Sequence, residues 1–195
     1  MAHLLITYSY SYDWLARGCP VEDWQGPFER GRAYQAAARA QWMPHEDAVF
    51  TAFVSMGLRF WEACPAYPVH LPAGVSGFKD PFTFLVLEDW EELRTLLVHE
   101  LCHLHEDHPA NAGRYAALLA HIRAAFPRED EGVQYHLITC TTQRAVLMQV
   151  FPRRWEAMVA RAQGHPILQR TWQLIAEREA LINWQDPWTS LTSLI

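Results

Sequence analysis

The spacing of proline limits where this chain can form helices. Proline lacks a backbone N–H and disfavours helical geometry in the residue before it, so a helix normally ends ahead of it. In the second half of the chain, Pro109, Pro127 and Pro152 divide the sequence into segments of helical length. A helical C-terminal part over 130–184 is therefore predicted. Its expected helices cover 130–151, 153–163 and 167–184, and an irregular tail begins at Asp186. Another helix is expected before this part, over 111–126.

The first half of the chain combines strands and helices. Residues 4–12 alternate between apolar and polar side chains, which is the period of a half-buried strand. Two N-terminal helices are expected within 28–64, one ending before Pro44 and one from 45 to 64. The proline- and glycine-rich stretch 65–81 predicts a long loop, with a short strand at 69–71. The segment 82–88 is rich in aromatic and β-branched residues and predicts another strand.

A helix over 90–107 follows that strand closely. Asp89 with Glu92 three residues later is an acidic variant of the N-capping box, which marks a helix start. Leucines spaced as one buried stripe continue from there: Leu93, Leu97, Leu101 and Leu104. Together these elements predict a mainly helical α+β fold with a small sheet, in a single domain spanning 1–195.

The helix 90–107 carries the motif His-Glu-Leu-Cys-His at 99–103. Positions four apart lie on the same helix face, so His99 and His103 can reach one ion. Glu100 lies one residue after His99 and can contact a water molecule without being a ligand. Zinc lowers the pKa of such a water toward about 7. The motif therefore predicts Zn²⁺ bound by His99 and His103, with Glu100 as the general base of a hydrolase.

The stretch FTFLVLEDWEELRTLLVHELCHLHEDH resembles the zincin clan of metallopeptidases. Its continuation to Pro127 is similar to small bacterial zincins of the SprT and WLM type, and the resemblance covers about 45 residues. It implies a zincin-like fold in which 82–88 is an edge strand beside the active-site helix. It also implies a peptide or protein substrate that lies along that strand, and a bacterial zinc peptidase.

A catalytic zinc site needs three protein ligands, and two candidates remain open for the third. His108 lies five residues after His103, and a break at Pro109 would let it turn back; the resembling families usually place this histidine one residue later. His136 lies on the helix 130–151, and zincins of the gluzincin type take their third ligand from such a later helix. Glu131 is a weaker option.

Two further roles follow from the motif and the resemblance. In many zincins a tyrosine or histidine donates to the oxyanion, and Tyr135, beside His136, is the candidate here. Glu106 or Asp107 is a candidate for orienting a histidine ring from behind. The Cys102 side chain points away from the metal face and is expected in the core.

Net charge and cysteine content limit the classes of partner and the cellular location expected for this chain. The net charge is −6 and no block of Lys or Arg occurs, which makes nucleic acid a poor partner. No apolar run is long enough to span a bilayer, the start MAHLLITYSYSYDW lacks the features of a signal peptide, and the four cysteines form no CxxC pair. A soluble cytoplasmic protein with reduced thiols is expected, its oligomeric state open.

Two alternatives to a peptidase remain at this point. One is a zinc-binding protein of zincin fold without proteolytic activity, acting as a regulator or partner-binding module. The other is a purely structural helical protein in which the His-Glu-x-x-His motif is fortuitous.

Overall fold

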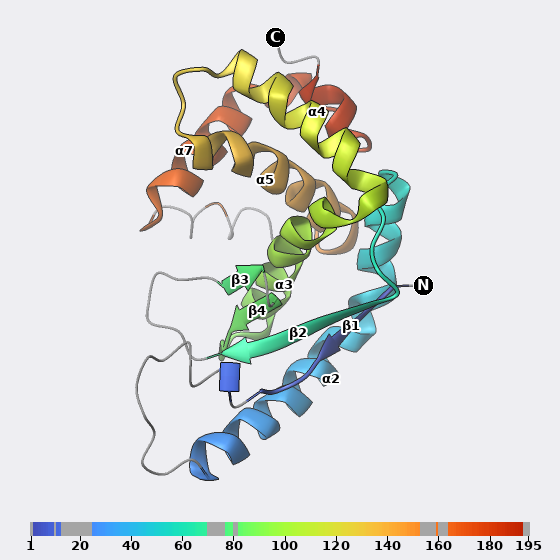
Figure 1. Cartoon of the computed structure of the whole chain (residues 1–195), viewed down its shortest axis with the longest axis vertical. Coiled ribbons are helices and arrows are strands. Elements are labelled where there is room, and N and C mark those ends of the chain that lie inside the picture. The colour runs from blue at the N-terminus through green and yellow to red at the C-terminus, as the bar shows by residue number, and fades with distance from the viewer. Residues whose placement is uncertain are drawn as a thin grey trace. The chain divides into compact units, whose positions relative to one another are not determined.

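The computed structural model describes residues 2–9, 11–12, 25–69, 77–79, 82–152, 159 and 164–192. The described part is mainly helical with one small sheet, which confirms the α+β class (Figure 1). Its strands are β1 (His3–Ile6), β2 (Ala63–Val69), β3 (Gly77–Lys79) and β4 (Phe82–Leu85). Its helices are α2 (Gln25–Ser55), α3 (Trp90–Leu104), α4 (Pro109–Ala125), α5 (Glu131–Val150), α7 (Pro166–Glu177) and α8 (Pro187–Leu191), with short 3-10 helices η1 (His105–Asp107) and η3 (Glu179–Leu181).

The chain divides into two compact units, which are described separately. The first comprises Met1–Phe50 and Phe60–Glu100, and the second comprises Thr51–Arg59 and Leu101–Ile195. The sheet lies in the first unit, and helices α4, α5, α7 and α8 lie in the second. No helix in the described ranges has the length and apolar character needed to cross a membrane.

The sheet of the first unit has the strand order β1-β2-β4-β3. The pairs β1–β2 and β2–β4 are parallel, and β3 is antiparallel to β4. The predicted strand over 82–88 therefore exists as β4, but it is not an edge strand, because it is paired on both sides. Among the described strands, β3 lies at that edge of the sheet.

Strand β1 is shorter than the predicted strand over 4–12. It ends at Ile6, although the Thr7 N–H still donates to the Ala66 carbonyl of β2 at 2.9 Å, and a side chain of α2 bonds the other edge of β1. Gln35 donates from Nε2 to the Ile6 carbonyl at 3.2 Å and accepts from the Tyr8 N–H at 3.2 Å. Residues 11–12 are already helical.

The prediction of a loop over 65–81 was wrong for 65–69, where β2 runs through Pro65 and Pro68, and for 77–79, where β3 forms. The first half of β2, Ala63–Ala66, pairs with β1, and its second half, Tyr67–Val69, pairs with β4. Among the described strands, each half has a neighbour on one side only, so a proline without an N–H is tolerated there, as on an edge strand. Residues 70–76 lie outside the described part.

Helix α2 corrects the prediction of two helices within 28–64, because it continues through the exposed Pro44. An internal proline costs about 3 kcal/mol. Side chains of the adjoining turns offset this cost: Trp42 is 1% exposed, and its Nε1 donates to Glu46 Oε1 at 2.9 Å. The same Glu46 oxygen accepts from the Leu4 N–H of β1 at 2.7 Å.

Helix α2 ends at Ser55 rather than at 64. Gly57 has φ +75°, a left-handed conformation that glycine adopts at little cost after a helix. Its N–H donates to the Val54 carbonyl at 2.9 Å, and the Leu58 N–H donates to the Phe53 carbonyl at 3.1 Å. The chain is then free to form β2.

Helix α5 is the core element of the second unit. Thirteen of its residues are buried, and it contacts α4, α7 and α8 (Figure 1). The irregular tail expected from Asp186 is corrected by α8, where the Asp186 side chain caps the helix by accepting from the Thr189 N–H at 3.2 Å. Trp188 of α8 is 1% exposed, and its Nε1 donates to Thr142 Oγ1 of α5 at 2.8 Å.

The other predicted helices of this unit are close to those observed. The helix over 111–126 corresponds to α4, and the helix over 130–151 corresponds to α5. The helix over 167–184 is divided into α7 and the 3-10 helix η3. The helix expected over 153–163 lies almost entirely outside the described residues.

Candidate metal centre

Helix α3 holds the His-Glu-Leu-Cys-His motif in the predicted way. Asp89 Oδ1 accepts from the N–H groups of Glu91 and Glu92 at 2.8 and 3.2 Å, which confirms the predicted cap. The leucine stripe is fully buried at Leu93, Leu97 and Leu101. This packing determines the rotation of α3 about its axis and so the direction of its remaining faces.

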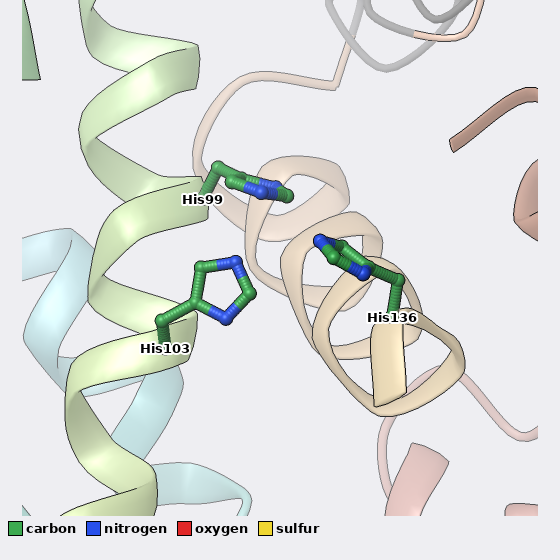
Figure 2. Close-up of side chains that lie close together, drawn as sticks. All are labelled: His99, His103 and His136. Carbon is green, nitrogen blue, oxygen red and sulfur yellow. The ribbon is translucent and has the colours of Figure 1, made fainter. Parts of the chain in front are cut away.

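Three histidines come together at this helix (Figure 2). One ligand nitrogen from each of His99, His103 and His136 lies within 4.8 Å of the other two. His103 and His136 belong to the second unit, and His99 lies one turn earlier on the same helix as His103. Figure 2 shows the rings of His99 and His103 projecting from α3 toward His136 on α5.

His136 is held by the helix that carries it. Its Nδ1 lies 2.7 Å from the Gly132 carbonyl oxygen, one turn earlier on α5. A carbonyl oxygen only accepts, so the proton is assigned to Nδ1 and the lone pair to Nε2. Burial lowers the pKa of His136. The hydrogen bond that the ring donates to the Gly132 carbonyl opposes this effect, and the nearby His165 adds to it. A neutral ring with a free nitrogen is the form that binds a metal ion.

The donor set suits a transition metal. The cluster offers three imidazole nitrogens, and magnesium or calcium would require oxygen ligands. Three protein ligands with a fourth position left open is the pattern of catalytic zinc sites, and imidazole is among the usual zinc ligands. The arrangement of His99, His103 and His136 could therefore hold such an ion.

Glu100 follows His99 on α3 and is 4% exposed. The helix turns about 100° per residue, so its side chain leaves the helix beside the face of His99 and His103. Burial excludes bulk water from this carboxylate, as a general base in a closed site requires.

A second set of polar side chains lies behind His103, all within the second unit. Tyr135 Oη lies 3.2 Å from His103 Nδ1, and it donates a hydrogen bond to Glu106 Oε2. Glu106 Oε1 lies 3.8 Å from His103 Nδ1, and Thr139 Oγ1 donates to that oxygen at 3.5 Å. Burial and then the charge of Glu106 raise the pKa of Tyr135, which keeps its phenol protonated.

Tyr115 of α4 adjoins this set. Its ring lies edge-on to that of Tyr135, with centroids 6.1 Å apart. Burial raises the pKa of Tyr115 most, and Glu106 and Tyr135 raise it further. Tyr115 therefore lies beside Tyr135 and near enough to Glu106 for that carboxylate to raise its pKa.

The other residues predicted as metal ligands are not part of the three-histidine cluster. Pro109 does break the helix, as predicted, but His108 then caps α4, with its Nδ1 accepting from the Ala110 N–H at 3.2 Å. Glu131 is exposed and paired with Arg123. Cys102 is fully buried, as expected.

Sequence reasoning identified Glu106 as a possible orienting group, but it missed Thr139 and Tyr115. The spacing alone could have indicated Thr139, which is three residues after His136 and four after Tyr135 on α5. Tyr115 had no such signal, because it comes from another helix.

The chain was compared with protein-family models, with curated proteins and with solved structures. None of the three comparisons found a match.

Proposed function

We propose that this protein is a zinc-dependent hydrolase of the metallopeptidase type. The observation that carries the proposal is that α5 brings His136 to the pair formed by His99 and His103. The motif alone supplied two ligands, and a catalytic zinc needs three. His136 supplies the third and leaves the fourth position for water or substrate.

The protein groups would divide the chemistry as follows. His99, His103 and His136 hold the ion, which when bound lowers the pKa of a water molecule and polarises the substrate carbonyl. Glu100 accepts the proton of the attacking water and returns it to the leaving group. The burial of Glu100 favours this role, because bulk water does not compete with the attacking water for this carboxylate.

A peptide or protein is the substrate class that we propose. The support is the resemblance of 82–127 to zincins, in which a strand precedes the active-site helix. Strand β4 has that place in the chain, directly before α3. The chemistry of the centre itself suits any carbonyl substrate of sufficient reactivity.

Metal content tests the ligand set. Protein purified without added chelator should contain one zinc per chain, and His136→Ala should lose it. His108→Asn is the matched control, because asparagine preserves the capping interaction with Ala110. Zinc retained in His136→Ala and lost in His108→Asn would contradict the proposal and reinstate His108.

Turnover tests the general base. Glu100→Gln should retain zinc and lose peptide hydrolysis by a factor of at least about 10², the lower end of general-base contributions. Unchanged hydrolysis would contradict the role of Glu100. One zinc per chain in a wild-type protein that cleaves no member of a peptide library would instead support the non-proteolytic zinc-binding alternative.

A further inference from the structure

We propose that Glu106 and Tyr135 form a relay that fixes the tautomer and orientation of His103 as a metal ligand. The proposal rests on the metal centre proposed above and concerns how one of its ligands is held. It assigns Tyr135 as a positioning residue, in place of the oxyanion donor expected from the resemblance to zincins.

The argument begins with the single hydrogen of the Tyr135 hydroxyl. That hydrogen points to Glu106 Oε2, a carboxylate oxygen that accepts. Toward His103 Nδ1, at 3.2 Å, the phenol oxygen can then only accept. The hydrogen in this second contact therefore belongs to His103 Nδ1, which leaves the lone pair on Nε2 for the ion.

Thr139 leads to the same assignment independently. Its hydroxyl donates to Glu106 Oε1 at 3.5 Å and lies 3.5 Å from His103 Nδ1. Having used its hydrogen on the carboxylate, it too can only accept from the histidine. Both oxygens of Glu106 are thus engaged by hydroxyls that face one imidazole nitrogen.

Ring packing fixes the orientation as well as the proton. The rings of His103 and Tyr135 are stacked, with centroids 5.4 Å apart and planes at 8°. The ring of His136 meets that of His103 nearly at right angles, at 82° and 5.3 Å between centroids. His103 is therefore confined on two sides, with its Nε2 left toward the cluster.

A carboxylate behind a metal-bound histidine raises the basicity of the ligand and holds its tautomer, and loss of such a partner costs about 10- to 100-fold in metal affinity. Here the carboxylate acts through a phenol, because Glu106 itself stands 3.8 Å from Nδ1. Removal of the phenol hydroxyl should thus have nearly the effect of neutralising the carboxylate.

Zinc affinity is the primary test. Dissociation constants are measured by competition with a chromophoric chelator for the wild type, Tyr135→Phe and Glu106→Gln. Both variants should bind zinc about 10- to 100-fold more weakly. The matched control is Tyr34→Phe, which removes another partly buried phenol whose hydroxyl bonds the Leu87 backbone at 2.9 and 3.1 Å. It should leave the zinc constant within about twofold of wild type.

The His103 tautomer is the second test, and it does not require metal. Nitrogen-15 NMR of the zinc-free protein distinguishes Nδ1–H from Nε2–H. We expect Nδ1–H in the wild type and a mixture in Tyr135→Phe. An oxyanion donor would instead lower kcat without changing either the tautomer or the zinc constant.

The outcomes separate the two proposals. Wild-type zinc affinity in both variants, with unchanged absorption of their cobalt-substituted forms, overturns the relay while the metal centre stands. A wild type that binds no zinc overturns the metal centre, and the tautomer measurement still decides the relay. If Glu106→Gln does not fold, Tyr135→Phe alone carries the comparison with Tyr34→Phe.

Discussion

Replacement of Thr142 by valine should destabilise the protein more than the same change at its neighbour Thr141. Both threonines lie on α5, both are fully buried, and each donates to the carbonyl one turn earlier, at 2.8 and 2.6 Å. Within the described part of the chain, only Thr142 also accepts a hydrogen bond, from Trp188 Nε1 at 2.8 Å. Thr142→Val therefore leaves a buried indole N–H without its partner, and Thr141→Val does not.

The expected difference follows from the cost of that orphaned donor. Leaving a buried hydrogen-bond donor unsatisfied costs about 1–3 kcal/mol, and the loss of the hydroxyl itself is common to both variants. The free energy of unfolding of Thr142→Val should therefore be about 1–3 kcal/mol lower than that of Thr141→Val. For a chain of this size its Tm should be lower by several degrees.

Urea denaturation followed by circular dichroism at pH 7 measures this difference. The same two threonine variants are also made in a Trp188→Phe protein, which lacks the indole N–H. There Thr142→Val should lower the free energy of unfolding no more than Thr141→Val does. Equal stability of the two threonine variants, within about 0.5 kcal/mol, would refute the claim that this bond anchors α8 to α5.

Two further predictions concern the backbone and the response to acid. Gly57→Ala places a Cβ at φ +75° and should lower the free energy of unfolding by about 1–2 kcal/mol. Gly113→Ala adds a Cβ that meets no described atom within 4 Å outside the backbone of α4, and it should raise that free energy by about 0.5–1 kcal/mol. Thermal unfolding measures both changes, and a loss of stability at Gly113 would contradict the reasoning. Hydrogen bonds from Arg170 hold the pKa of Glu129 below its ordinary value of 4.5, so this pair stabilises the fold above that pH and loses its effect as the pH falls through the lower folded-state pKa. Urea midpoints of wild type and Glu129→Gln should therefore differ at neutral pH and converge as the pH falls below the lowered pKa of Glu129, and parallel curves would show that the pair is not the cause.

Helix α3 could be predicted from the sequence because its determinants are local. The cap at Asp89, the leucine stripe and the spacing of His99 and His103 all lie within one helix, and each acts over three or four residues. No information from the rest of the chain was needed to place these two histidines on one face.

The predictions that rested on proline were wrong at Pro44, Pro65 and Pro68, where other contacts outweighed the local tendency of proline to end a helix or strand. At Pro44 the burial of Trp42 and the hydrogen bonds to Glu46 keep α2 continuous. In β2, Pro65 and Pro68 fit because the strand changes its partner between them. The Leu4 N–H that bonds Glu46 and the strand partners of β2 lie far away in the sequence, so a window around each proline does not contain them.

The candidate for a third ligand could not be chosen from the sequence for a similar reason. His108 had the expected helix break, but its side chain is used by the next helix as a cap. His136 is 33 residues from His103 along the chain, and only the packing of α5 brings the two together. The distance between two helices is not encoded in the periodicity of either.

The hydrogen bond between His136 and Gly132 places the candidate metal centre near the start of helix α5. The N–H of Gly132 is held by the Asp130 cap at 2.7 Å, and its carbonyl oxygen holds the His136 ring at 2.7 Å. First turns are where helices fray. Unwinding α5 by one turn would release the ring of His136 in the same event, so an ion bound at this centre would act as a clamp on the end of the helix.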